Sequence, residues 1–175
     1  MKVLVVIDMQ KDFTTGALGN PETAAVVPNV AAYIEKFRKE NKDGKIIATL
    51  DTHTEDYMNT QEGRNLPVPH CIRGTEGWKL EDAVENAIGE EAIKLEKVTF
   101  GAVDIPFAIG RDENIDEIQL IGVCTDICVI SNAMILKAAF PEVPIKIIAD
   151  CCAGVTPESH NNALNAMKMC QMEIA

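Results

Sequence analysis

Short runs of consecutive apolar residues recur along the chain. The first, Val3 to Ile7, contains no polar residue, as expected of a strand buried on both faces of a sheet. Each run is far shorter than the roughly 20 apolar residues that a membrane span needs. The predicted strands are residues 3–7, 46–50, 92–95, 118–123 and 145–149.

Between these runs, apolar residues recur every three or four positions, which is typical of a helix with one buried face. The predicted helices are residues 26–42, 80–88, 127–139 and a last helix that starts at Thr156-Pro157, an N-cap followed by proline. Strands that alternate with helices predict an α/β fold, with a mainly parallel sheet between two layers of helices. We find no repeat or linker, so residues 1–175 are expected to form a single three-layer domain.

Composition limits the classes of partner. The net charge is −11 and the pI is about 4.7, which argues against nucleic acid or an anionic membrane as a partner, because both bind basic patches. We see no secretory leader, so the expected location is the cytoplasm. There, cysteines are expected to be reduced thiols rather than disulfides. The six are Cys71, Cys124, Cys128, Cys151, Cys152 and Cys170.

Each predicted strand is followed by an ionisable, polar or thiol-bearing residue. These residues are Asp8, Asp51, Glu96-Lys97, the segment Cys124 to Cys128, and Asp150. In parallel sheets, ligands bind beyond the carboxyl ends of the strands. Five such ends favour one shared functional site.

Cys128 is the candidate nucleophile of that site. It lies in the first turn of a helix predicted over residues 126–140, with Thr125 or Asp126 as the expected cap. Backbone N–H groups and the helix dipole at that end stabilise a thiolate and could hold an oxyanion. The alternative is a buried structural cysteine, since cysteine is among the most buried residue types.

Asp8 and Lys97 favour the catalytic interpretation of Cys128. A carboxylate can take the thiol proton and later give it to a leaving group. A nearby ammonium would favour the thiolate and keep the carboxylate ionised. The alternatives are a turn residue for Asp8 and a solvated surface lysine for Lys97.

A second group of residues suits a metal ion. Asp51, His53 and His70 offer one carboxylate and two imidazoles, the donor set of a catalytic zinc, manganese or iron site, and Glu62 could add a fourth ligand. Otherwise the two histidines are hydrogen-bonded loop residues. They flank or lie in a long irregular segment, residues 54–78, of a kind that is usually functional or disordered. His160 is interpreted as structural or exposed, and the remaining cysteines as packing residues.

The order and spacing of several motifs resemble the nicotinamidase/isochorismatase superfamily of cysteine hydrolases over essentially the whole chain. The most specific motif is Gly122 to Val129, of sequence GVCTDICV. The others are Asp8-Met9-Gln10 with Asp12-Phe13, then Asp51-Thr52-His53, Pro69 to Gly77, and Lys97.

The resemblance implies a catalytic triad of Asp8, Lys97 and Cys128. It also implies a cis peptide between Val123 and Cys124 and an oxyanion hole made by the backbone N–H groups of Cys124 and Cys128. In the nicotinamidase branch, a metal held by the aspartate and the two histidines binds the pyridine nitrogen while the cysteine attacks the carboxamide.

For this chain, the resemblance makes Asp51, His53 and His70 the ligands of one divalent transition metal, with zinc the first candidate and manganese or iron the others. Some family members add a carboxylate where Glu62 stands. Isochorismatases lack the full metal set, so these residues favour hydrolysis of nicotinamide to nicotinate and ammonia, within pyridine nucleotide salvage and NAD metabolism. A homo-oligomer is also implied.

Two departures leave the substrate open. Pro67 stands where nicotinamidases prefer an aromatic residue, and the segment after Lys97 lacks a tyrosine that many of them carry. Phe13 matches a ring-packing position of the family, and Phe100 is the candidate substitute for the tyrosine. The alternatives are therefore vinyl ether hydrolysis of the isochorismatase type or hydrolysis of another small amide on the same fold. A phosphate-accepting receiver domain or an inactive binding protein are more distant alternatives.

Overall fold

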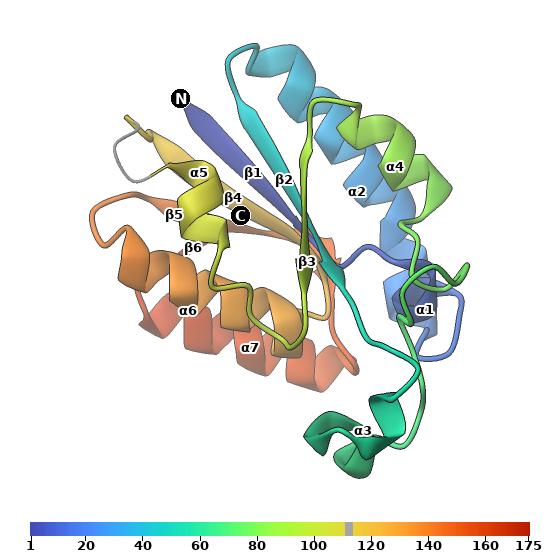
Figure 1. The fold of residues 1–175 in the computed structure, drawn as a ribbon. Helices are drawn as coiled ribbons and strands as arrows, with labels where there is room; N and C mark the ends of the chain where they lie inside the picture. Colours follow the sequence, from blue (N-terminus) through green and yellow to red (C-terminus); the bar gives the residue numbers. More distant parts are fainter. Residues whose placement is uncertain (111–113) are drawn as a thin grey trace.

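The computed structural model describes residues 1–110 and 114–175, and these residues form one six-stranded sheet (Figure 1). All neighbouring strands run parallel, in the order β3-β2-β1-β4-β5-β6. The strands are β1 (Lys2–Ile7), β2 (Lys45–Asp51), β3 (Ile93–Lys97), β4 (Glu117–Val123), β5 (Ile145–Ala153) and β6 (Glu173–Ile174).

Helices cover both faces of this sheet, which confirms the predicted three-layer fold (Figure 1). On one face lie α1 (Lys11–Thr14), α2 (Pro21–Glu40) and α4 (Asp82–Ile88), and on the other lie α5 (Ile105–Ile109), α6 (Ile130–Ala139) and α7 (Pro157–Met169). The short helices η1 (Tyr57–Asn59) and α3 (Gln61–Asn65) project beyond the edge of the sheet. Within the described residues, no helix has the length and apolar character required to traverse a bilayer.

The unbroken apolar run of β1 follows from its central position. Alternate residues of a strand point to opposite faces, so Val3, Val5 and Ile7 join the core under α6 and α7. Leu4 and Val6 join the core under α2 and α4. Five consecutive side chains are thus fully buried.

Several elements differ from the sequence-based prediction. Helix α2 starts earlier, at Pro21, because Asn20 and Thr23 form a capping box that the search for apolar periodicity overlooked. Strand β5 continues past its predicted end to Ala153, after a register shift against β4. The predicted cap of the last helix is confirmed, because the Thr156 side chain accepts a hydrogen bond from Ser159 N–H.

The helix predicted over residues 126–140 is divided in two. It begins with a π-helical turn, η2 (Thr125–Val129), and continues as α6. Neither Thr125 nor Asp126 caps the turn, because η2 has no side-chain cap. Instead, Thr125 Oγ1 lies 2.8 Å from His160 Nδ1, and the Asp126 carboxylate accepts from Val155 N–H at 3.2 Å.

Gly122 allows β1 and β4 to approach closely beside the functional edge of the sheet. It has a φ of +119°, and a Cβ atom there would lie 2.1 Å from the carbonyl oxygen of Ile7. Only glycine fits such a backbone and such a distance. The residues that follow the two strands, Asp8 and Cys124, are consequently brought side by side.

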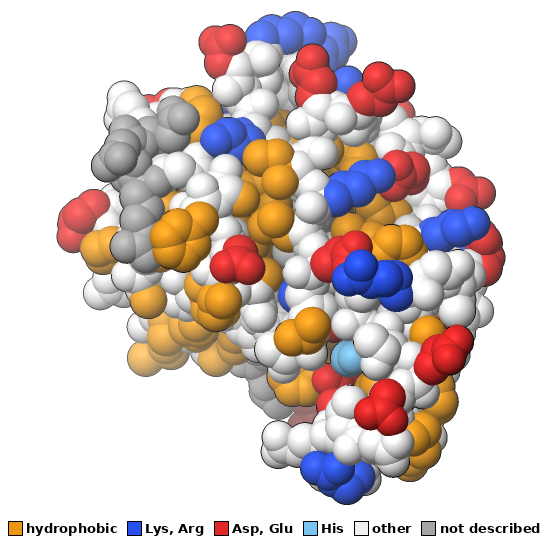
Figure 2. Space-filling model, viewed as in Figure 1, with side chains coloured by type: hydrophobic (Ala, Val, Ile, Leu, Met, Phe, Trp, Pro, Cys, Tyr) orange, Lys and Arg blue, Asp and Glu red, His pale blue; other side chains and the backbone are white. Residues whose placement is uncertain are grey.

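Charged side chains of both signs are mixed on the face shown in Figure 2, with hydrophobic side chains exposed between them around β3 and α5. Val98 and Val103, which follow β3, are 79% and 69% exposed.

Candidate active site

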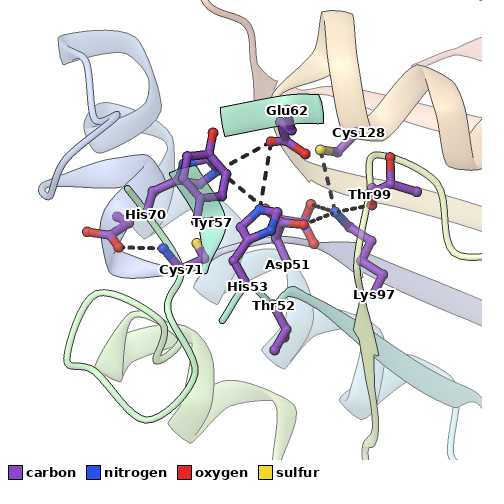
Figure 3. Close-up of polar contacts among 12 residues, drawn as sticks. Asp51, Thr52, His53, Tyr57, Glu62, His70, Cys71, Lys97, Thr99 and Cys128 are labelled. Atoms are coloured by element: carbon purple, nitrogen blue, oxygen red, sulfur yellow. Dashed lines mark hydrogen bonds and ion pairs between the residues drawn. The ribbon is translucent and has the colours of Figure 1, made fainter. Parts of the chain in front are cut away.

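Lys97 lies at the centre of the three residues predicted to form the triad. Its Nζ is 2.7 Å from Asp8 Oδ2 and 3.7 Å from Cys128 Sγ (Figure 3 shows the latter contact). Asp8 follows β1, Lys97 ends β3 and Cys128 lies in η2, so three separate elements converge. All three side chains are buried, which excludes the alternative of a solvated surface lysine.

Asp8 has one carboxylate oxygen available for proton transfer. Its Oδ1 accepts a hydrogen bond from Thr49 Oγ1 at 2.7 Å. Its Oδ2 accepts no hydrogen bond within the described residues, since Lys97 meets it as an ion pair without hydrogen-bond alignment. Burial raises the pKa of Asp8, and Lys97 only partly offsets that effect. A buried carboxyl group with a raised pKa is suited to take up and release a proton.

The Cys128 thiol differs from the expected thiolate. Burial raises its pKa well above the ordinary value and the Asp8 charge adds to this, whereas Lys97 acts in the opposite direction. Burial therefore favours the thiol form of Cys128 and outweighs the opposite effect of the Lys97 ammonium. A nucleophilic role for Cys128 would then require a base, and the neighbouring Asp8 carboxylate is the candidate.

Four potential metal ligands lie together next to the triad. One donor atom from each of Asp51, His53, Glu62 and His70 lies within 4.8 Å of all the others. The Nε2 atom of His53 is 2.9 Å from Asp51 Oδ2, and that of His70 is 3.5 Å from the same oxygen (Figure 3). Two imidazoles and two carboxylates fit a divalent transition metal such as zinc.

The surroundings of the histidines favour the ligand role. The Nδ1 atom of His70 is 2.9 Å from the carbonyl oxygen of Val68, so Nδ1 donates its hydrogen there and Nε2 is the ring nitrogen that faces the cluster. Tyr57 packs edgewise against both imidazole rings, at centroid distances of 4.8 and 5.0 Å. The alternative of two separate loop histidines does not account for this convergence.

Asp51 connects the metal cluster with the triad. Its Oδ1 accepts a hydrogen bond from Lys97 at 3.1 Å, while its Oδ2 faces the histidines (Figure 3). Burial alone would raise the pKa of Asp51, but the hydrogen bonds with His53 and His70 outweigh it and hold the pKa far below the usual value. Asp51 is therefore an ionised carboxylate that serves both groups.

Gln10 fixes the backbone of Asp51. Its Oε1 accepts from Asp51 N–H at 2.7 Å, and its Nε2 donates to the Asp51 carbonyl at 2.8 Å. The fully buried Gln10 side chain thus pairs with the Asp51 backbone as a neighbouring strand would, just beyond the last paired residues of β1 and β2. This explains in physical terms why a glutamine stands two residues after Asp8.

A narrow, mainly apolar cavity joins the two groups of polar residues. Phe13 and Phe100, the two predicted ring-contacting residues, both contribute to its walls. Leu66 also lines it, next to Pro67, where the sequence comparison expected an aromatic residue. The complete lining is Phe13, Leu18, Asp51, Glu62, Leu66, His70, Phe100, Cys124, Ile127 and Cys128.

Some predicted members of the site lie elsewhere. Asp150 is exposed within β5, since the strand extends beyond it, and Glu96 pairs with Arg73 at the surface. The cis peptide implied by the resemblance is present at Val123–Cys124. Sequence reasoning missed Thr49 in β2 and Tyr57 in η1, because single hydroxyl groups in a strand and a short helix carry no pattern of their own.

Comparisons with known proteins agree with this geometry. The model of the isochorismatase domain matches residues 2–175. The nicotinamidase/pyrazinamidase of Mycobacterium tuberculosis is 25% identical over 190 residues, covering 99% of this chain and 98% of that protein. The nicotinamidase of Schizosaccharomyces pombe is 26% identical over 209 residues, covering 98% of this chain and 91% of that protein.

Two solved structures share the fold of this chain. The pyrazinamidase of Pyrococcus horikoshii in complex with zinc superimposes with a TM-score of 0.84 at 29% identity, covering 99% of this chain and 98% of that one. The nicotinamidase/pyrazinamidase of Bacillus subtilis gives a TM-score of 0.85 at 27% identity, with 99% and 98% covered. From these matches and the site geometry, we conclude that this chain belongs to the isochorismatase family of hydrolases, on the branch that contains the nicotinamidases.

Proposed function

We propose that the protein is a metal-assisted cysteine amidohydrolase that converts nicotinamide to nicotinate and ammonia. The observation that carries this proposal is the position of Asp51, which joins the four-residue donor cluster to the triad across one narrow cavity. A ring bound there would have a metal-ligating group on one side and the Cys128 thiol on the other. The nicotinamidase and zinc-bound pyrazinamidase relatives support this assignment.

Asp51, His53 and His70 would hold one divalent transition metal, with Glu62 as the fourth protein ligand and zinc as the first candidate. When bound, the metal supplies an open coordination position for a neutral ring nitrogen. Phe13 and Phe100 would contact the faces of a flat ring. The cavity walls exclude water from the ring, and the triad acts on the carboxamide.

The triad would act in two stages. In the first, Cys128 Sγ attacks the carboxamide carbon while Asp8 Oδ2 takes the thiol proton. The N–H groups of Cys124 and Cys128 would hold the oxyanion, since N–H groups in the first turn of a helix lack partners within the helix. Asp8 then gives its proton to the departing nitrogen, which leaves ammonia and a thioester at Cys128.

In the second stage, water attacks the thioester carbonyl while Asp8 accepts a proton from that water. The C–S bond breaks, the proton on Asp8 passes to the Cys128 sulfur, and nicotinic acid leaves; it gives its proton to the released ammonia and becomes nicotinate. Lys97 stays protonated throughout, because Asp8, Cys128 and Asp51 raise its pKa despite its burial. Its charge keeps the carboxylates and the developing thiolate stable in a buried site.

The proposal is tested by measuring ammonia release from nicotinamide by the metal-loaded protein. Adding hydroxylamine tests the thioester separately, since it should divert the acyl group to nicotinohydroxamic acid. Absence of both products in correctly folded, metal-loaded protein would contradict the proposal. With nicotinamide as substrate, the protein would act in pyridine nucleotide salvage, and we place that activity in the cytoplasm.

We also propose that the chain forms a homo-oligomer. The exposed apolar side chains around β3 and α5, among them Val98 and Val103, support this, because large exposed apolar patches mark interaction sites. Light scattering of the purified protein would measure its mass in solution, and a monomer at all concentrations would contradict this part of the proposal.

A further inference from the structure

Asn132 is a fully buried amide in α6, one turn after the nucleophile, and it has no part in the triad or the metal cluster. Its side chain makes hydrogen bonds in two directions. Towards its own helix, Nδ2 donates to the carbonyl oxygen of Cys128 at 2.8 Å. Towards the segment after β3, Nδ2 donates to the carbonyl of Phe100 at 3.1 Å, and Oδ1 accepts from Ala102 N–H at 2.8 Å.

These partners determine how the amide is oriented. The two acceptors are carbonyl oxygens and the one donor is a backbone N–H. A flipped amide would place its oxygen against two carbonyls and its NH₂ against an N–H group. Because a buried amide without compatible partners is costly, one orientation is selected and both contacts are held together.

Both segments joined by Asn132 belong to the candidate active site. On one side, Cys128 is the proposed nucleophile. On the other, Thr99 O accepts a hydrogen bond from Lys97 Nζ at 3.0 Å, and the next residue, Phe100, lines the cavity although 45% of it is exposed. Within the described contacts, the Asn132 amide is the side-chain link between the Phe100 carbonyl and the nucleophile turn.

We propose that Asn132 is a positioning residue that fixes the Phe100 wall of the cavity against the turn carrying Cys128. The consequence for activity rests on the proposed function, since Phe100 would contact the substrate ring. The two links have separate effects. The contact with Phe100 and Ala102 sets how tightly a ring is held, whereas the contact with Cys128 O sets the position of the sulfur atom.

Two substitutions separate these effects. Asn132→Thr has nearly the same volume, and its hydroxyl can bond the carbonyl four residues earlier, which is Cys128 O, but is too short to serve Phe100 as well. We expect KM for nicotinamide to rise at least about fivefold, because the hydrogen bonds to Phe100 O and from Ala102 N–H are both lost, with kcat within about twofold of wild type. Asn132→Ala removes both links, so kcat should also fall by about fivefold or more.

Gln119→Leu is the matched control for a general loss of stability. Gln119 is also buried, and its side chain bonds Glu117 and Tyr33 in β4 and α2, away from the cavity. This control should lower the melting temperature by a similar amount while leaving KM and kcat unchanged. If Asn132 had only a structural role, Asn132→Thr and Asn132→Ala would behave like Gln119→Leu, with a lower melting temperature and unchanged KM and kcat.

Hydrogen exchange provides a measurement that does not depend on the substrate. The Ala102 amide should exchange faster in both Asn132 variants, whereas amides of residues 125–129 should exchange faster in Asn132→Ala alone. If Asn132→Thr leaves both the Ala102 amide and KM at wild-type values, or if the two variants behave alike, the inference is overturned. Should the wild type not hydrolyse nicotinamide, the proposed function fails while the exchange rates still decide the role of Asn132.

Discussion

Asp51 and Lys97 are paired residues at the ends of β2 and β3, and their side chains meet at 3.1 Å. The pairing places a candidate metal ligand and a member of the candidate triad on adjacent strands at the same level of the sheet. Substrate anchoring and bond cleavage would therefore depend on one contact. The following predictions separate the contributions of the individual residues.

The nucleophile is tested by Cys128→Ala. We expect no measurable turnover, because no other described thiol lies beside both Lys97 and Asp8, while metal content and melting temperature remain near wild type. Cys124→Ala is the matched control and should do much less, since only its backbone N–H is invoked. Ammonia release measures both variants, and a reversal of the two effects would identify Cys124 as the nucleophile.

The proton carrier is tested by Asp8→Asn, which keeps the size of the side chain and removes its basicity. The rate should fall by at least about 100-fold, the usual contribution of general acid–base catalysis. Thr49→Val removes the two hydrogen bonds that Thr49 Oγ1 makes with Asp8, to Oδ1 and from the backbone N–H, but leaves the carboxylate in place and should have a much smaller effect. Near-wild-type activity of Asp8→Asn would leave Asp8 as a residue of the turn after β1.

Metal binding is tested by elemental analysis. The purified protein should carry about one divalent transition metal per chain, and His53→Ala should lose it, since a catalytic site has few protein ligands to spare. His160→Ala is the matched control and should keep the metal, because His160 contacts Thr125 instead. A metal-free wild type with full activity would instead favour the isochorismatase-type alternative.

The role of the ring nitrogen is tested with three amides. Nicotinamide and pyrazinamide should both release ammonia, because each presents a ring nitrogen at the same distance from the carboxamide. Benzamide should be far poorer, since it offers the metal no ligand. The comparison is of kcat/KM for the three compounds, and equal values for benzamide and nicotinamide would rule out anchoring through the metal.

Acid should weaken the link between α7 and η2. Burial lowers the pKa of His160 below its ordinary value of 6.5, although Asp126 partly opposes this. Between pH 6.5 and the lower pKa of the folded state, the unfolded chain binds more protons than the folded chain. The contribution of His160 to the free energy of unfolding is therefore fully present above pH 6.5 and is lost as the pH falls through the folded pKa.

His160→Asn provides the comparison for this pH effect. Asparagine can keep the hydrogen bond to Thr125 but does not titrate. Melting temperatures measured between about pH 7.5 and 5 should therefore fall less for the variant than for wild type. Identical slopes would show that His160 does not titrate differently on folding.

The sheet and its functional edge could be predicted because buried parallel strands leave a direct mark in the sequence. An all-apolar run such as Val3 to Ile7 has few interpretations other than a buried strand. The polar residue that follows such a run is then expected at the carboxyl end of the strand, where ligands bind in parallel sheets. Asp8, Asp51 and Lys97 were located in this way, whereas Asp150 was misplaced because β5 continues beyond it.

Other features leave no such mark. Strand β6 has only two residues, and α1 has four, too few to show a period. The π-helical turn at Cys128 has the same apolar spacing as an ordinary helix. Thr125 is a good cap by residue type, but tertiary contacts bind it to His160, and local propensity cannot reveal that partner.

Gly122 influences the position of Asp8 relative to Cys128 without contributing a functional group of its own. A methyl group there would press on Ile7, the residue just before Asp8. Gly122→Ala would push β1 and β4 apart and displace the proposed base, Asp8, from the Cys128 thiol, although every proposed reactive atom would remain in the chain. The distance over which the proposed proton transfer takes place would thus be set by the absence of one carbon atom.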